Sequence, residues 1–320
     1  MYAYKRTLVC NGRGKKNRRV SAALAAIGIL LVVLSLFLVR SSRGQTTTPS
    51  RESPVKPTIK IVETANASSS KKSSSPFNEA ISQNGMLRNE LSWTFGGKQQ
   101  HGWYLYDVLI GKTLDTQYEF DTDDFASALS SWQKRRAISS SGVLDEESLM
   151  ALVSQWQNDR LKDRTPARPD QLITAPSSDF YDPERLADLR QVERATYAAY
   201  KQMITAAIAE PSLKLAHTSE VELAPTEKYF KIVSSFRSPE YQEELRRRSP
   251  NAGTAGLAIN SPHFTGRALD LYVGGDPVDT KDSNRAIQVN SPAYKWLVQN
   301  AERFGFRPYF YEPWHWEFVR

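Results

Sequence analysis

Hydrophobic residues recur at helical spacing in two neighbouring stretches, FDTDDFASALSSWQKRRAI and GVLDEESLMALVSQWQ. Three large apolar residues fall on one face of each: Phe125, Leu129 and Trp132 in the first, and Leu149, Leu152 and Trp156 in the second. In the first stretch Thr122 is a suitable N-cap and acidic residues follow it. The pattern predicts two helices that pack through their Leu and Trp faces.

Further along the chain, one long helical pattern is followed by two short strand patterns and a second helical pattern. Residues 182–210 have a long helical pattern with Pro183 in its first turn. Apolar and polar residues alternate in 227–236 and 268–273, which predicts strands, and 294–306 predicts a helix ended by a glycine. Because no regular alternation of strand and helix is present, we expect an α+β fold. A small antiparallel sheet flanked by helices would form the C-terminal domain. In the sequence it would be preceded by a small, mostly helical domain and an N-terminal transmembrane helix.

The segment from Val20 to Val39 contains twenty residues without a charge, the length a helix needs to cross a bilayer. Seven Lys and Arg precede it and two follow, so the N-terminus is expected in the cytoplasm. A cleaved signal peptide is the alternative, although the apolar run is longer than is usual for one. In either case the chain after Arg40 lies outside the cytoplasm. We expect a single-pass membrane protein whose C-terminal part lies on the outer side of the membrane.

Composition divides the chain into segments. Residues 41–76 are rich in Ser, Thr, Pro and Lys and predict a flexible linker. Residues 77–165 resemble small helical peptidoglycan-binding modules, although a plain helical pair has the same pattern. The predicted segments are a cytoplasmic basic tail (1–19), a transmembrane anchor (20–39), a linker (40–76), the helical domain (77–165), a Pro-rich connector (166–182) and the C-terminal domain (183–320).

The charge of the chain is unevenly distributed. The net charge is +7, but residues 1–43 hold nine Lys and Arg and no acid, which leaves 33 basic against 35 acidic residues in the remainder. The exported part therefore offers no basic surface for nucleic acid. The single cysteine, Cys10, is on the cytoplasmic side. A metal in the exported part would be held by His, Asp or Glu.

Two of the four histidines stand in unusual contexts. His263 lies in SPHFTGRALD, seven residues before Asp270, and EPWH contains both Glu312 and His315. Two imidazoles, one carboxylate and a further glutamate are the components of a catalytic zinc site with an open fourth position. Pro313 disfavours a helix through EPWH, so we expect an extended segment that bends to bring Glu312 and His315 to one pocket. The tryptophans on either side of His315 would line this pocket.

The other two histidines, His101 and His217, have no acidic partner at ligand spacing. We expect both to be ordinary surface or structural residues.

These motifs resemble those of the VanY-type zinc D-Ala-D-Ala carboxypeptidases, whose superfamily includes VanX-type dipeptidases and the Hedgehog signalling domain. The resemblance spans about residues 185–320. The matching residues are Ser261, His263, Gly266, Ala268 and Asp270, then Glu312, Trp314 and His315, with Arg237 and Gln242 of SFRSPEYQ upstream.

The resemblance implies that His263, Asp270 and His315 bind zinc and that Glu312 is the general base. It further implies that Arg237 stabilises the developing oxyanion, that Ser261 and Gln242 contact the substrate, and that Trp314 lines its pocket. Gly266 and Ala268 would keep the backbone close to the metal.

The local sequence supports the role of Arg237 independently. Ser238, Pro239 and Glu240 form a good helix start directly after it. The exposed N–H groups of a helix N-terminus favour anions such as a peptide's terminal carboxylate.

We therefore expect a membrane-tethered zinc carboxypeptidase that removes terminal D-alanine from peptidoglycan stem peptides. An anchor and a wall substrate together imply the inner membrane of a bacterium, with a periplasmic or extracellular catalytic domain. Within the enzyme class, an L,D-carboxypeptidase or a peptidoglycan endopeptidase is the alternative. Outside it, the alternatives are a catalytically inactive zinc-containing wall-binding module and a structural tether.

Overall fold

The computed structural model describes residues 75–116, 119–248 and 260–320. The predicted basic tail, membrane span and nearly all of the linker lie outside these residues. Among the described residues, no helix combines the length and apolar character needed to cross a membrane. Ser69–Arg320 forms one compact unit. The predicted boundaries of the helical domain, connector and C-terminal domain stay predictions.

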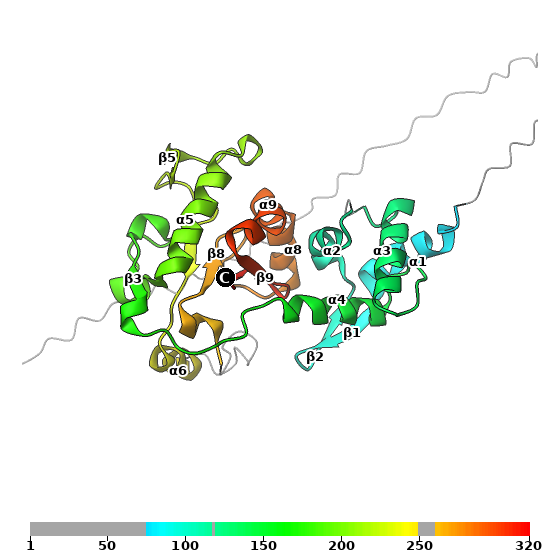
Figure 1. Cartoon of the computed structure of the whole chain (residues 1–320), viewed down its shortest axis with the longest axis horizontal. Coiled ribbons are helices and arrows are strands. Elements are labelled where there is room, and N and C mark those ends of the chain that lie inside the picture. Colours follow the sequence, from blue (N-terminus) through cyan, green and yellow to red (C-terminus); the bar gives the residue numbers. More distant parts are fainter. Residues whose placement is uncertain (1–74, 117–118, 249–259) are drawn as a thin grey trace, which may run out of the picture. The chain divides into compact units, whose positions relative to one another are not determined.

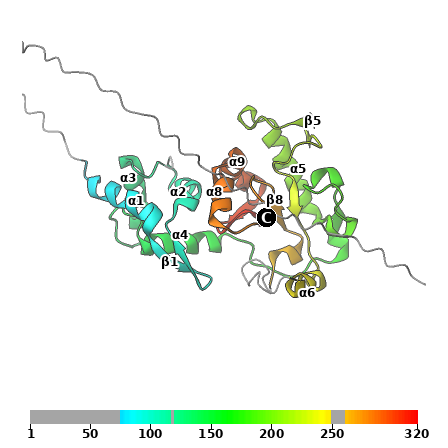
Figure 2. The same ribbon diagram turned by 180° about the vertical axis from the view of Figure 1, so that it is seen from behind.

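The first part of this unit is mostly helical (Figures 1 and 2). Its elements are α1 (Asn78–Glu90), β1 (Ser92–Phe95), β2 (Lys98–His101), the short 3₁₀ helix η1 (Tyr104–Tyr106), α2 (Asp107–Leu114), α3 (Asp123–Arg135) and α4 (Glu146–Asn158). The two predicted helices are confirmed as α3 and α4, and the six apolar residues of their predicted faces are buried. Thr122 caps α3 by accepting a hydrogen bond from the N–H of Phe125, and Asp145 caps α4.

The long helix predicted for residues 182–210 is wrong in its first half. Residues 191–193 form β4 (Gln191–Glu193), which pairs with β3 (Leu172–Thr174), and α5 (Arg194–Ile208) begins only after it. Glu193 ends the strand and caps the helix, because its carboxylate accepts hydrogen bonds from the N–H groups of Ala195 and Thr196. A strand partner distant in sequence and a local cap thus override the helical period. Three short 3₁₀ helices complete this region: η2 (Pro169–Gln171), η3 (Ser177–Asp179) and η4 (Ala187–Leu189).

The remaining elements follow in order: η5 (Pro211–Leu213), β5 (His217–Ser219), β6 (Glu222–Leu223), β7 (Ile232–Ser234), α6 (Pro239–Arg248), η6 (Pro262–Thr265), β8 (Ala268–Leu271), α8 (Asp282–Asn290), α9 (Pro292–Asn300), η7 (Ala301–Phe304), β9 (Phe306–Tyr309) and β10 (Glu312–Phe318). The predicted strands within 227–236 and 268–273 are present as β7 and β8. The helix predicted over 294–306 is present as α9 and η7, and Gly305 ends it with a positive φ.

A four-stranded antiparallel sheet in the order β7-β8-β10-β9 positions the histidine and aspartate motifs of the C-terminal part. Its two central strands are β8 and β10, and they place His315 opposite Asp270 and Trp316 opposite Leu269. Because side chains alternate between the faces of a sheet, the first pair faces one side and the second pair faces the other. The mixture of helices with a small antiparallel sheet agrees with the α+β expectation.

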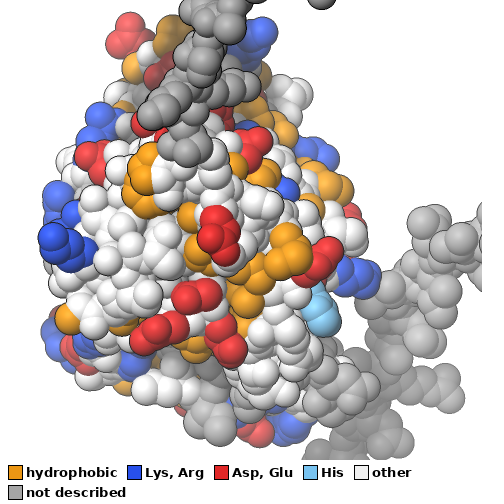
Figure 3. All heavy atoms as spheres, turned by 90° about the vertical axis from the view of Figure 1, so that its right-hand side faces the viewer, with side chains coloured by type: hydrophobic (Ala, Val, Ile, Leu, Met, Phe, Trp, Pro, Cys, Tyr) orange, Lys and Arg blue, Asp and Glu red, His pale blue; other side chains and the backbone are white. Residues whose placement is uncertain are grey.

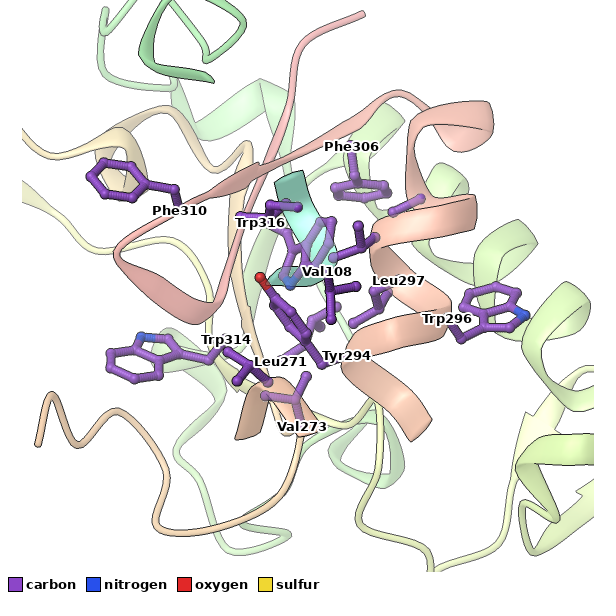
Figure 4. Packing of buried hydrophobic residues seen from close by; sticks show 14 of the residues in the cluster. Val108, Leu271, Val273, Tyr294, Trp296, Leu297, Phe306, Phe310, Trp314 and Trp316 are labelled. Atoms are coloured by element: carbon purple, nitrogen blue, oxygen red, sulfur yellow. The ribbon is translucent and has the colours of Figure 1, made fainter. Parts of the chain in front are cut away.

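One face of this sheet is covered by apolar packing from α8 and α9 (Figures 1 and 4). In Figure 4 Tyr294 and Leu297 of α9 point toward Leu271 and Trp316, and Val108 of α2 lies in the same cluster. All five side chains are buried. Full burial of each such side chain contributes about 1.5–3 kcal/mol, which fixes β8 and β10 in place. The opposite face is left for the polar residues described below.

The face seen in Figure 3 carries mixed charges. Acidic side chains gather there beside hydrophobic ones, and Lys and Arg lie mainly toward its margins. No continuous basic patch is visible among the described residues on this face.

Candidate metal centre

Three side chains from three different elements converge on one point. His263 lies on η6, Asp270 on β8 and His315 on β10, and one ligand atom from each lies within 4.8 Å of the others. Each side chain is almost fully buried, with exposed fractions of 3%, 1% and 3%. The structure thus brings together the three residues that the sequence suggested as metal ligands.

His263 presents its Nε2 atom to the cluster. Its Nδ1 atom lies 2.7 Å from the carbonyl oxygen of Ser235, just beyond β7. Since a carbonyl oxygen accepts hydrogen bonds, Nδ1 is the donor, and Nε2 is left with its lone pair 3.3 Å from Oδ1 of Asp270. The 3₁₀ helix is held to the same loop because the N–H of Arg237 donates to the carbonyl of His263 at 3.2 Å.

His315 lies between two carboxylates. Its Nδ1 atom is 2.9 Å from Oδ1 of Asp270, and its Nε2 atom is 3.2 Å from Oε1 of Glu317. Glu317 is completely buried. No sequence motif marked this glutamate as functional, although a glutamate two residues after a strand histidine lies on the same face of that strand, which is a usable signal.

The charges of the cluster fix the protonation of each group in the metal-free chain. Burial, reinforced by the positive charge of Arg237, lowers the pKa of His263 to about 4, so its ring is neutral at pH 7. Burial also disfavours a charged His315, but hydrogen bonds to Asp270 and Glu317 outweigh it and raise its pKa to about 9. Burial alone would raise the pKa of Asp270, yet the two imidazoles and Arg237 hold it well below its ordinary value.

This donor set fits a zinc ion. Two imidazole nitrogens and one carboxylate oxygen are a common ligand set of catalytic zinc, which retains a further position for water or substrate. The second nitrogen of each imidazole has an acceptor, Ser235 for one ring and Glu317 for the other. Such outer contacts orient the rings of metal-binding histidines and are typical of metal sites.

Glu312 lies near the cluster without belonging to the group of close ligand atoms. It is the first residue of β10, and the pairing of β10 with β9 shifts register between Glu312 and Trp316. The expected extended segment with an irregularity near Pro313 is therefore present. Burial, which the positive charge of His315 offsets only in part and the negative charge of Asp270 reinforces, raises the pKa of Glu312 to about 7. A carboxylate with this pKa can accept a proton near neutral pH and return it.

Arg237 lies against the cluster from the side of α6. Its Nη2 donates to Oδ2 of Asp270 at 2.8 Å and its Nε donates to Ser234 Oγ at 3.0 Å. The hydroxyl of Ser238 accepts from the N–H of Tyr241 at 3.1 Å, so the expected helix start directly after Arg237 is present. A guanidinium and a helix N-terminus therefore occur together beside the cluster.

The three residues expected to contact substrate are placed differently from one another. Gln242 is fully buried, and its Oε1 accepts from Nη1 of Arg237 at 3.5 Å, so it supports the arginine. The hydroxyl of Ser261 caps η6 by accepting from the N–H of His263 at 3.3 Å. Trp314 is buried in the hydrophobic cluster, and in Figure 4 its ring lies apart from Trp316.

The structure shows why a glycine is required at position 266, which its sequence context did not reveal. Its φ is +65°, and a Cβ there would lie 2.9 Å from the backbone nitrogen of Glu193 and 2.8 Å from Leu172. The glycine therefore lets η6 pack closely against β3 and β4, and its own N–H donates to the carbonyl of His263. Ala268 is fully buried on β8.

The two remaining histidines lie on exposed strand positions, His101 on β2 and His217 on β5. Neither belongs to the metal-binding group found among the described residues.

Comparison with known proteins relates the C-terminal part of the chain to one family. Residues 190–320 match the family model VanY, D-alanyl-D-alanine carboxypeptidase. All of the residues proposed above for the site, from Arg237 to His315, lie within this match. No curated protein matches the chain.

Two solved structures show similarity at low identity. One is a mutant of the vancomycin-resistance D,D-pentapeptidase VanY from a VanB-type resistance cassette, in complex with Zn(II). It is 19% identical, covers 52% of this chain and 89% of its own, and has a TM-score of 0.29. The other is VanYB in complex with D-alanine-D-alanine, with 20% identity, coverages of 43% and 76%, and a TM-score of 0.27.

Proposed function

We propose that this chain removes terminal D-alanine from peptidoglycan stem peptides through residues 190–320, which belong to the VanY family of D-alanyl-D-alanine carboxypeptidases. The chain is a metallopeptidase of the D-alanyl-D-alanine carboxypeptidase type. Zinc is its metal, and His263, Asp270 and His315 are the residues that would hold it.

The observation that carries this proposal is the convergence of the three ligand atoms within 4.8 Å, inside the part of the chain that matches the family. Arg237 and Glu312 act on the same cluster electrostatically. A bound zinc ion would polarise the scissile carbonyl and lower the pKa of water, which makes water a nucleophile at neutral pH.

Glu312 would be the general base and acid of the reaction. Its carboxylate would accept a proton from the attacking water and deliver it to the amine of the departing D-alanine. Its pKa of about 7 suits both steps, because an efficient proton carrier titrates near the working pH. Hydrolysis by water in a single displacement requires no covalent intermediate on the chain.

Arg237 would bind the anionic parts of the substrate. Its guanidinium offers several N–H donors in a plane, and Gln242 and Ser234 hold it in position. These donors, with the N-terminus of α6, suit either the terminal carboxylate of the peptide or the oxyanion that develops at the scissile carbonyl. Ser261, Gln242 and Trp314 remain candidates for contacts to the substrate.

The proposed location follows from the N-terminal sequence. We propose that residues 20–39 anchor the chain in the cytoplasmic membrane of a bacterium, with residues 77–320 on the outer side of that membrane. Residues 77–165 would then help to hold the insoluble wall substrate near the membrane.

The proposal is tested by measuring D-alanine release from a synthetic stem pentapeptide by the full-length chain. We expect release that stops on addition of a chelator and returns with stoichiometric zinc. Glu312→Gln should lower the rate by about 10²–10⁴-fold while zinc stays bound. Glu220→Gln, which changes an exposed glutamate in a loop, is the matched control and should keep full activity.

Other outcomes would select an alternative. Bound zinc without any release of D-alanine would indicate an inactive wall-binding module. Pelleting with isolated cell walls without bound metal would indicate a structural tether. Release from a tetrapeptide or cleavage within cross-linked muropeptides, measured by mass spectrometry, would indicate an L,D-carboxypeptidase or an endopeptidase.

A further inference from the structure

We infer that Glu317 is a positioning residue for His315 and that Arg160, Leu161 and Arg164, which lie outside the VanY match, hold Glu317 in place. This inference rests on the proposed function only in taking His315 as a zinc ligand. It extends the centre to a carboxylate and an upstream segment that the family motifs do not contain.

The contacts of Glu317 are unusually complete. Its Oε1 lies 3.2 Å from His315 Nε2 and 3.2 Å from both the Nε of Arg160 and the Nη1 of Arg164. Its Oε2 accepts from the backbone N–H of Leu161 at 2.9 Å. The carboxylate is completely buried, whereas the arginine side chains are 14% and 18% exposed. A buried carboxylate needs such partners, since an unpaired charge in the interior is costly.

These partners determine which nitrogen of His315 faces the metal. Two guanidinium groups and an amide keep Glu317 an anionic acceptor, so Nε2 must be the donor in its contact with Oε1. The lone pair of the neutral ring is then on Nδ1, which lies 2.9 Å from Asp270 inside the group of ligand atoms. Glu317 therefore holds the ring both in orientation and in the tautomer that can coordinate.

Arg160 also contacts the metal centre indirectly, through the ring of Tyr309. The guanidinium of Arg160 lies over the ring of Tyr309, 3.9 Å from its centroid, and the rings of Tyr309 and His315 form a T-shaped pair with 6.0 Å between ring centres. Arg160 and Leu161 follow directly after α4. The segment that follows α4 is thus in contact with the carboxylate that supports a metal ligand, some 155 residues further along the chain.

The test measures zinc affinity and ring protonation rather than activity alone. In the zinc-loaded full-length chain, long-range ¹H–¹⁵N correlation of the histidine rings should show His315 protonated at Nε2 and coordinated through Nδ1. Competition with a chelator of known affinity should show a dissociation constant raised about 10-fold in Glu317→Gln and up to about 100-fold in Glu317→Leu. Arg160→Met combined with Arg164→Met should weaken zinc binding in the same direction.

The control is Asp107→Asn, which breaks a half-buried carboxylate–arginine pair, with Arg88, that is not among the contacts of the metal centre. It should leave zinc affinity within twofold. Coordination of His315 through Nε2 would overturn the inference, and this result needs no variant and so does not depend on Glu317→Leu folding. Unchanged affinity in Glu317→Gln would overturn it too.

Failure of this inference is distinguishable from failure of the proposed function. Wild-type chain that releases D-alanine while Glu317→Gln binds zinc normally would refute the role of Glu317 alone. Wild-type chain that coordinates zinc through Nδ1 of His315 yet releases no D-alanine would refute the carboxypeptidase and leave Glu317 as assigned.

Discussion

Replacing Gly266 by alanine should destabilise the chain strongly, because two separate costs act at this position. Its φ of +65° is left-handed, which costs a residue with a Cβ about 1–2 kcal/mol. The new Cβ would also lie 2.9 Å from the backbone nitrogen of Glu193, where no flexible side chain can yield. Forced overlap of this kind typically costs about 1–3 kcal/mol. We therefore expect a loss of about 2–5 kcal/mol in the free energy of unfolding.

Gly97 provides the matched control for this substitution. Its φ is +75°, but a Cβ there would meet no atom within 4 Å, so Gly97→Ala carries the backbone cost alone. We expect it to lose only about 1–2 kcal/mol. Urea denaturation of the metal-free chain measures both values.

The Gly266 substitution should also weaken zinc binding, because the N–H of Gly266 donates to the carbonyl of His263 and a shift there moves a ligand. The same chelator competition measures this effect. Equal stability losses in the two alanine variants, within about 0.5 kcal/mol, would refute the close packing of η6 against Glu193.

Three further outcomes are expected. Arg237→Ala should lower kcat/KM by about 10²–10³-fold, and Arg237→Lys should recover only part of it because a lysine lacks the planar fork; full activity in either would exclude the oxyanion role. The pH profile of kcat/KM should rise as Glu312 loses its proton, with a midpoint at or below the pKa of about 7 because zinc favours the charged form; a Glu312→Gln enzyme with the same acid limb would contradict this. Burial, only partly offset by Arg88, raises the pKa of Asp107 from 3.8 to about 6, so the folded chain binds more protons in this range and its stability falls as pH rises. This contribution is about 3 kcal/mol at most. Between pH 4 and pH 7 the wild type should therefore lose up to that much more stability in urea denaturation than Asp107→Asn, which keeps every other titrating group.

The sequence identified the metal-binding group because its chemistry is concentrated in short motifs. His263 and Asp270 are seven residues apart, and EPWH supplies His315 directly. The cap at Thr122 and the helix start at Ser238 were likewise predictable, since each depends on residues within one turn.

The contacts that escaped prediction all join segments far apart in the chain. The helical pattern of residues 182–210 gave no sign that 191–193 pair with β3, so that prediction failed. Arg160 and Glu317 have unremarkable sequence contexts, and only the folded chain brings them together.

The antiparallel pairing of Asp270 with His315 has a consequence for when the ion can enter. These residues are 45 positions apart, and the chain between them contains α8 and α9, so the two strands adjoin only when a long loop closes. Closing so long a loop is slow compared with local helix formation. In a newly made chain the ligand side chains would therefore lie far apart and bind metal weakly until the sheet assembles. Metal binding would then be the last step of maturation, in whichever compartment the polypeptide reaches its native state.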